Sequence, residues 1–180
     1  GFSVLHDEAL VPAYRGKIPM VIKNTNNPKH PGTKIVLNHT NENVKVVGIA
    51  GDSGFVSINT TKYLMNREVG FGRKLLQILE DLNISWDHMP TGIDDLSVIL
   101  RSKELTPIKE QEILKHLIQD LQVDYAEIEH DLSIIMIVGE NMKNQIGVTA
   151  TATKALSENN INIQMISQGS SEVSIMFVVN

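Results

Sequence analysis

The feature that most constrains this chain is an internal repeat, in which residues 70–99 and 147–176 align without gaps at a constant offset of 77 residues. In this alignment Gly70 falls on Gly147, Asn83-Ile84 on Asn160-Ile161, Gly92 on Gly169, and Ser97-Val98 on Ser174-Ile175. Each copy contains a helical pattern, an Asn-Ile turn into an apolar strand, a glycine turn and a second apolar strand. A tandem unit of this kind admits few folds, and we expect function in the loop that opens each copy.

The composition excludes several classes of function. A net charge of −5, with no cluster of Lys or Arg, argues against a nucleic-acid partner, whose phosphates require a basic face. The absence of cysteine removes disulfides, thiolate catalysis and cysteine-based metal sites, and it is typical of a cytoplasmic protein. The histidines are scattered without ligand spacing, so no metal site is expected. No apolar stretch is long enough to cross a bilayer, and no signal peptide is recognisable, so no membrane partner is expected.

The order of predicted elements indicates a ferredoxin-like fold. Residues 1–43 contain only a helical turn near 7–10, strands at 18–23 and 33–37, and a polar linker at 38–43, and they look like the tail of another domain. From residue 44 onward the predicted order is strand–helix–strand–strand–helix–strand, followed by a second, shorter copy. The predicted strands are 44–50, 55–59, 84–89, 96–101, 125–130, 133–139, 161–167 and 173–179, and the predicted helices are 69–82, one that opens at Thr106-Pro107, and 146–158.

Two details of this organisation carry alternatives. The run Gly51-Asp52-Ser53-Gly54 predicts a hairpin-type break between the strands at 44–50 and 55–59. The second copy ends at Asn180, without the helix and strand that follow the first copy. Either the strand at 44–50 completes the second sheet, or a closing helix lies outside this chain, and the two explanations are compatible.

Two segments of the first copy have the chemistry of an amino-acid receptor. At the predicted helix start, Met65 to Gly72, glycines let a ligand approach the backbone, and free N–H groups attract a carboxylate. Ser85-Trp86-Asp87 then places a carboxylate that can accept an ammonium group. The corresponding points of the second copy lack the acid; they are Gln145, Ile146, Gly147 and Val148, with Asn162, Ile163 and Gln164.

Each of these features also has a purely structural explanation. Gly70 and Gly72 can serve only to turn the chain into the helix, Met65 and Phe71 can be core residues, and Asp87 can be a solvated edge residue. The occurrence of the same loop at the same place in both copies favours the functional interpretation.

Three segments of the chain resemble the regulatory end of aspartate kinase. The segment from Val4-Leu5-His6 through Ile22-Lys23-Asn24-Thr25-Asn26-Asn27-Pro28 to Pro31-Gly32-Thr33-Lys34-Ile35 is similar to the end of the kinase domain. Residues 71–100 resemble the first ACT domain of that family. The run Ile161-Asn162-Ile163-Gln164-Met165-Ile166-Ser167-Gln168-Gly169-Ser170-Ser171-Glu172, with Ser174-Ile175, resembles the second and is the most specific of the three.

The resemblance implies an α+β chain of two interleaved ferredoxin-like ACT modules that follow the tail of a kinase domain. The implied division is 1–43 for the tail and linker, 52–131 for the first module, and 44–51 with 132–180 for the second. ACT modules of this family bind pathway end products, which implies lysine, threonine or both as effector. The pocket carried over by position consists of Met65, Gly70, Phe71, Gly72, Ser85, Trp86, Asp87 and Thr91. Gly72 stands where some members of the family have Leu, so the shape of the pocket at this position is expected to differ from theirs.

The same resemblance implies a role in feedback inhibition. The parent enzyme would phosphorylate aspartate with ATP and Mg²⁺, whereas this chain, which lacks most of the kinase domain, is expected to hold no cofactor and to have no kinase activity alone. ACT sheets commonly pair between subunits, so a homodimer with the effector at its interface is expected. A separately made regulatory subunit and a ligand-free dimerisation module are the alternatives.

Overall fold

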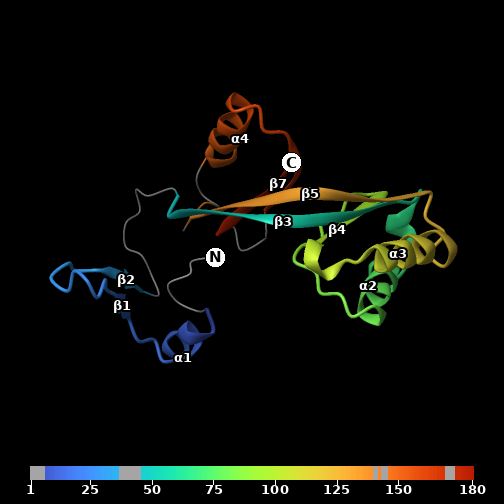
Figure 1. The fold of residues 1–180 in the computed structure, drawn as a ribbon. Helices are drawn as coiled ribbons and strands as arrows, with labels where there is room; N and C mark the ends of the chain where they lie inside the picture. The colour runs from blue at the N-terminus through green and yellow to red at the C-terminus, as the bar shows by residue number, and fades with distance from the viewer. Residues whose placement is uncertain (1–6, 37–45, 140–141, 143–145, 169–172) are drawn as a thin grey trace.

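The computed structural model describes residues 7–36, 46–139, 142, 146–168 and 173–180, which form a five-stranded antiparallel sheet with helices and a separate two-stranded sheet (Figure 1). The strands of the large sheet lie in the order β4-β3-β5-β7-β6. Their bounds are β3 Gly48–Thr61, β4 Asp95–Arg101, β5 Tyr125–Val138, β6 Ile163–Gln168 and β7 Ser174–Val179. This mixed architecture confirms the predicted fold class, and β4, β6 and β7 confirm the strands predicted near their positions.

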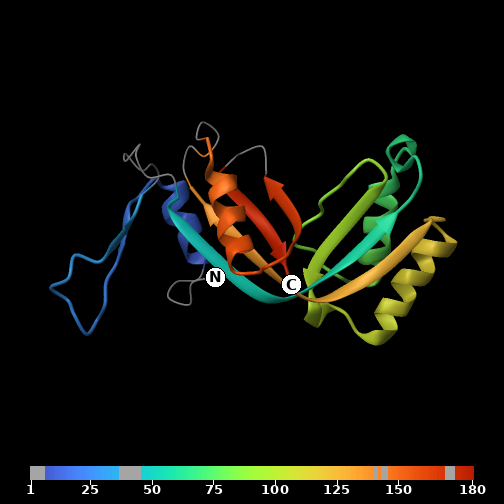
Figure 2. The same ribbon diagram turned by 90° about the horizontal axis from the view of Figure 1, so that it is seen from above.

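Strands β3 and β5 run the length of the large sheet and are shared by its two halves (Figure 2). Residues 55–61 of β3 pair with β4, whereas residues 133–138 of β5 pair with β7. The predicted hairpin-type break at 51–54 is therefore wrong, and so is the division of β5 into strands 125–130 and 133–139. Gly54 at φ 82° and Asp131 at φ 59° lie in a β-bulge. The register of β3 against β5 shifts there, but the pairing of the two strands continues on both sides.

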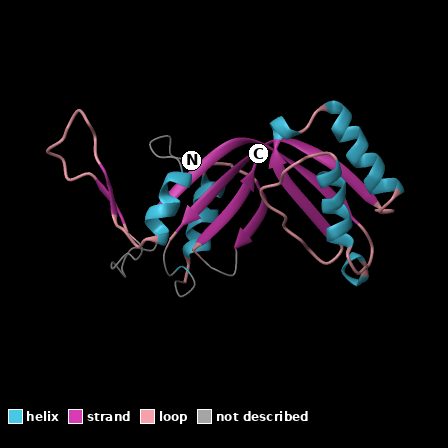
Figure 3. Ribbon diagram, turned by 90° about the horizontal axis from the view of Figure 1, so that it is seen from below, coloured by secondary structure: helices cyan, strands magenta, loops and turns pink. Residues whose placement is uncertain are grey.

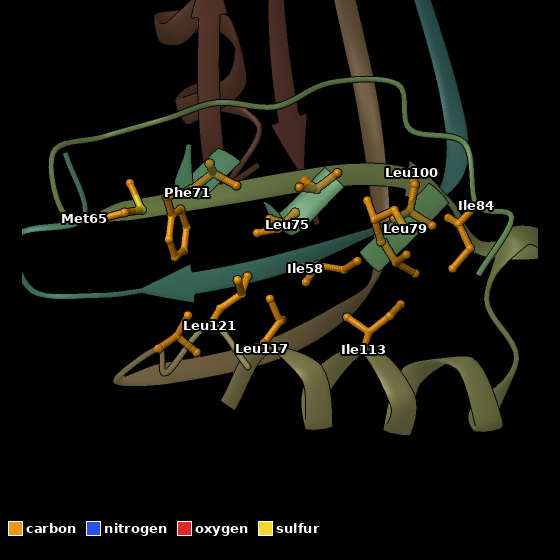
Figure 4. Close-up of a cluster of buried hydrophobic side chains, with 14 residues drawn as sticks. Ile58, Met65, Phe71, Leu75, Leu79, Ile84, Leu100, Ile113, Leu117 and Leu121 are labelled. Atoms are coloured by element: carbon orange, nitrogen blue, oxygen red, sulfur yellow. The ribbon is translucent and has the colours of Figure 1, made fainter. Parts of the chain in front are cut away.

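The first half of the sheet carries two helices on one face, α2 Phe71–Asp81 and α3 Pro107–Gln119 (Figure 3). Apolar side chains at helical spacing fill the layer between them and the strands (Figure 4). The fully buried members of this layer include Val56, Ile58, Leu75, Val98, Leu100, Ile113 and Leu117. The predicted start of α3 is confirmed, because the Thr106 hydroxyl accepts a hydrogen bond from the Lys109 N–H at 3.3 Å.

The second half of the sheet carries helix α4, Val148–Glu158, whose apolar side packs on Ile137, Ile175 and Phe177. The predicted repeat is confirmed in the backbone as well as in the sequence. Gly70 at φ 82° and Gly147 at φ 91° precede helices of 11 residues each. The two turns that follow these helices also match, since Asn83 and Asn160 have φ values of 52° and 56°.

We expect Gly70→Ala and Gly147→Ala each to lower the free energy of unfolding by about 1 kcal/mol, because a Cβ disfavours positive φ. Among the described residues, no atom outside the adjacent positions lies within 4 Å of where a Cβ would be at Gly147 or at Gly48, but Gly48 has no positive φ. Gly48→Ala is therefore the matched control and should change stability little. Urea denaturation measures all three variants, and equal losses at Gly48 and Gly147 would contradict the backbone explanation.

The strand predicted at 84–89 is not formed as a regular strand. The segment follows the free edge of β4, but it makes only two isolated bridges, His88 to Ile99 and Thr91 to Leu96. The N–H groups of Asp87 and His88 both donate to the Ile99 carbonyl, at 2.8 and 3.2 Å, so the regular alternation of a strand ladder is lost here. We call residues 84–91 the edge segment.

The N-terminal part forms a small unit that projects away from the large sheet (Figure 1). Helix α1 spans Leu10–Arg15 after a single 3₁₀ turn, and it extends further than the turn predicted at 7–10. Strands β1 Met20–Ile22 and β2 Thr33–Ile35 pair antiparallel, in agreement with the predicted strands at 18–23 and 33–37. Leu37 and the linker predicted at 38–43 lie outside the described residues. The division of the chain into domains stays a prediction.

Candidate functional site

The loop between β3 and α2, residues 62–70, is fixed by one carboxylate between two lysines. The Glu68 side chain accepts from Lys62 Nζ and from Lys74 Nζ, each at 2.6 Å. Lys62 Nζ also donates to the Leu121 carbonyl at 2.6 Å, which ties the loop to the end of α3. We call this arrangement the Glu68 clamp. It links the end of β3, the first turn of α2 and the end of α3.

The predicted site residues of this loop divide into buried and accessible ones. The side chains of Met65 and Phe71 point into the core layer and are only 4% and 3% exposed (Figure 4). Gly70 caps α2 without a side-chain hydrogen bond, and Gly72 follows in its first turn. Among the predicted site residues at this helix start, the accessible groups are therefore backbone groups, since the two large side chains are engaged in the core.

The clamp shifts the acid–base behaviour of Glu68. Hydrogen bonds from Lys62 and Lys74 hold the pKa of Glu68 below its ordinary value. Nothing in the sequence pattern indicated this residue, because each lysine is six positions away and the contacts depend on the path of the loop.

We expect the Glu68 clamp to make stability depend on pH on the acid side. A carboxyl whose pKa is lowered on folding stabilises the protein above its unfolded-state pKa of about 4.5, and this contribution disappears as pH falls through the folded pKa. At pH 7 the free energy of unfolding of Glu68→Gln should therefore be lower than that of the parent. As the pH falls from 5 to 3, it should decrease less than that of the parent. Chemical denaturation across this range, with the exposed Glu112→Gln as control, tests the expectation; parallel pH curves for the parent and Glu68→Gln would contradict it.

Ser85 and Trp86 lie beside the later turns of α2. They line an open hollow of about 570 Å³ together with Leu76, Glu80, Asn83, Ile84 and Glu104. Trp86 is 45% exposed, and it is the single tryptophan of the chain. This hollow combines an aromatic face with two carboxylates, which is a suitable environment for a cation.

Asp87 is exposed and lies near a cation of its own chain. Its Oδ2 is 4.0 Å from Nε of Arg101, at the end of β4. Thr91, at the far end of the edge segment, is exposed and lies opposite Leu96, which pairs with Thr60 of β3. Asp87 thus carries a carboxylate that is accessible but already has a positive neighbour.

The structure separates the predicted site residues of the first copy into two groups. Gly70 and Phe71 lie at the start of α2, whereas Ser85 and Trp86 follow its end. An α-helix of 11 residues is about 16 Å long, so one small ligand cannot contact both groups within a single chain. The residue set as a binding site stays a prediction.

The equivalent region of the second copy is an apolar hollow. Ile146, Gly147 and Val148 line a space of about 420 Å³ with Val46, Ile49, Ile137 and residues of α4, and none of its described lining residues is acidic. Asn162 is exposed, and Ile163 is half-buried against the core of this half. Gln145 lies outside the described residues.

The described parts of the chain contain no group of three His, Asp or Glu side chains close enough to hold a metal ion. Among the same residues no helix is both long and apolar enough to span a membrane.

Comparison with known proteins identifies the relatives of this chain. Residues 135–180 match the model of a family described as an ACT domain. Over 179 residues, which are 99% of this chain, the sequence is 55% identical to Aspartokinase 3 of Bacillus subtilis. The chain belongs to the aspartokinase family. It spans 39% of the length of that relative and corresponds to the regulatory region of the family.

Two solved aspartokinases have the same fold. Aspartate kinase of Clostridium acetobutylicum, described as an allosteric enzyme, superposes with a TM-score of 0.91 at 38% identity, over 100% of this chain and 42% of its own. Aspartokinase III of E. coli, in a complex with lysine and aspartate, superposes with a TM-score of 0.73 at 25% identity, over 98% of this chain and 38% of its own. The predicted resemblance to the regulatory end of aspartate kinase is confirmed.

Proposed function

We propose that this chain senses an end-product amino acid for an aspartokinase, with L-lysine as the first candidate and L-threonine as the second. An effector that binds the inactive arrangement more tightly shifts the population toward it, which produces feedback inhibition. The observation that carries this proposal is the likeness, over 98% of this chain, to an E. coli aspartokinase in a complex with lysine and aspartate.

In this proposal a second copy of the chain completes the binding site. When two edge segments pair antiparallel about a two-fold axis, the two α2 helices run in opposite directions. The start of one α2 then lies beside the end of the other, where Ser85, Trp86 and Asp87 follow. Such a dimer brings together the two groups of residues that one chain keeps apart, and it also covers the free edge of the sheet.

The chemistry of the two groups suits an amino acid. The N–H groups at the start of α2, where the cap residue Gly70 offers no side-chain acceptor, favour a carboxylate. The exposed carboxylate of Asp87 favours an ammonium group. The Trp86 hollow, with Glu80 and Glu104, gives a long cationic side chain a place to lie, which favours lysine over threonine.

For the whole enzyme we propose the ATP- and Mg²⁺-dependent phosphorylation of aspartate in the cytoplasm. We expect this chain alone to have no kinase activity, because its role in the proposal is regulatory. These statements concern the longer protein, of which the chain matches about two fifths in the relatives compared.

Calorimetric titration with L-lysine and then L-threonine, with L-methionine as control, tests the proposal. We expect lysine to bind with a stoichiometry near one per chain and to change the fluorescence of Trp86, the single tryptophan. Sedimentation measured with and without lysine should show the dimer. If none of the three amino acids releases heat on titration into the folded chain, the proposal is contradicted.

A further inference from the structure

Arg101 lies between two carboxylates that belong to different strands. Its Nη1 is 2.8 Å from Oδ2 of Asp52 in β3, and its Nε is 4.0 Å from Oδ2 of Asp87 in the edge segment. The three side chains are between 37% and 47% exposed, so solvent reaches all of them. One guanidinium therefore connects the β-bulge of the central strand with a residue of the proposed ligand site.

The position of Arg101 is set by β3 rather than by Asp87. Its guanidinium lies 4.1 Å from the centre of the buried Phe55 ring, and it makes a close ion pair with Asp52. Asp52 is itself fixed, because its other oxygen accepts from the Ser53 N–H at 3.0 Å. The bond from Arg101 also lowers the pKa of Asp52. The contact with Asp87 is too long for a hydrogen bond, so Asp87 keeps its capacity to accept one from a ligand.

We propose that Arg101 is a positioning residue that sets the affinity of Asp87 for the ammonium group of an amino-acid ligand, and that Asp52 limits this effect by holding Arg101 away from Asp87. The inference rests on the proposed function, since it assumes that Asp87 binds the ligand. A second cation near one carboxylate competes with the incoming ammonium group. Arg101 thus keeps effector affinity lower than Asp87 alone would give.

Arg101→Gln and Asp52→Asn should change lysine affinity in opposite directions. Arg101→Gln removes the competing charge and should raise lysine affinity two- to five-fold, which is about 0.4–1 kcal/mol and lies within the range for exposed ion pairs. Asp52→Asn keeps an oxygen for the Ser53 N–H but weakens the hold on Arg101. Arg101 then moves closer to Asp87, and lysine affinity should fall by a similar factor. A purely structural role of this cluster would lower affinity in both variants.

Calorimetry with L-lysine on the parent and the variants tests the inference. Arg101→Lys keeps the charge and should retain the parent affinity within about two-fold, and Lys115→Gln, an exposed charge on α3, should leave the affinity unchanged. Opposite shifts for Arg101→Gln and Asp52→Asn support the proposal. Shifts in the same direction, or none, in a parent that binds lysine would overturn it without affecting the proposed function.

A ligand-free measurement separates this inference from the proposed function. The Nε–Hε signal of Arg101 in an NMR spectrum, assigned by its loss in Arg101→Gln, should respond to Asp87→Asn. The response should be larger in the Asp52→Asn background, where Arg101 lies closer to Asp87. If the parent binds no amino acid, the proposed function fails, and the part of the inference that concerns ligand affinity fails with it. An Arg101 signal that is insensitive to Asp87→Asn in both backgrounds overturns the remainder.

Discussion

Replacing Asp87 by alanine is expected to weaken L-lysine binding by about ten- to a hundred-fold while the fold stays intact. The proposed site gives the ammonium group this carboxylate as its charged partner, and a hydrogen bond to a charged group contributes about 1.5–3 kcal/mol. Asp87 is exposed, and its side chain makes one long contact, with Arg101 at 4.0 Å. Its removal should therefore change the unfolding free energy by less than about 0.5 kcal/mol. Calorimetry and urea denaturation of the same sample measure the two effects.

Asp81→Ala is the matched control for this experiment. Asp81 is also exposed and lies at the end of α2, where its side chain accepts from Gln77 Nε2 at 2.9 Å. It carries the same charge at a short distance along the chain, so its removal reproduces any general effect of charge on lysine binding. Equal losses of affinity in Asp81→Ala and Asp87→Ala would mean that long-range attraction, and not a specific contact, explains the effect. Unchanged affinity in Asp87→Ala would remove this residue from the proposed site.

The repeat made the helical layer predictable from the sequence. A glycine directly before a periodic apolar pattern indicates that the backbone takes a positive φ where the helix begins. Gly70 and Gly147 both do so. Thr106-Pro107 likewise marks the start of α3 by local chemistry. Such features are encoded by neighbouring residues, so one sequence is enough to find them.

The errors arose where pairing across the sheet decides the outcome. Residues 51–54 have a turn-like composition, but the partner strand β5 continues beside them and turns the expected break into a bulge. The apolar residues at 84–89 have strand-like composition, yet only two bridges to β4 form. The composition of one segment does not specify its hydrogen-bonding partner, so these two outcomes could not be derived locally.

The contacts of the candidate site were also hidden from the sequence. The sequence pattern gives neither Glu68 nor Arg101 a partner: the two lysines of Glu68 lie six positions away on either side, and Asp52 lies on a different strand from Arg101. Lys62 illustrates the point, because its Nζ reaches a carbonyl 59 positions away. The sequence identified the accessible carboxylate Asp87, but not the cation beside it.

Leu117→Ala is expected to lower the free energy of unfolding by about 3 kcal/mol. Leu117 is fully buried where α3 meets the sheet, and truncation of a buried Leu leaves a cavity that the surroundings fill only in part. Alanine preserves the helix, so the loss reports packing. The neighbouring Ile118 is 49% exposed, and Ile118→Ala, the control, should cost less than about 1 kcal/mol in the same urea titration. Equal costs would contradict the packing of α3 on the sheet.

The consequence of this packing reaches the candidate site. The Leu121 carbonyl at the end of α3 accepts from Lys62, which also binds Glu68 of the loop that opens α2. A loosened α3 should therefore loosen this loop, and Leu117→Ala should weaken lysine binding beyond what its unfolded fraction explains. Ile118→Ala should leave binding unchanged. Undiminished affinity in the folded fraction of Leu117→Ala would show that the helix start keeps its geometry without support from α3, and that the Glu68 clamp serves stability alone.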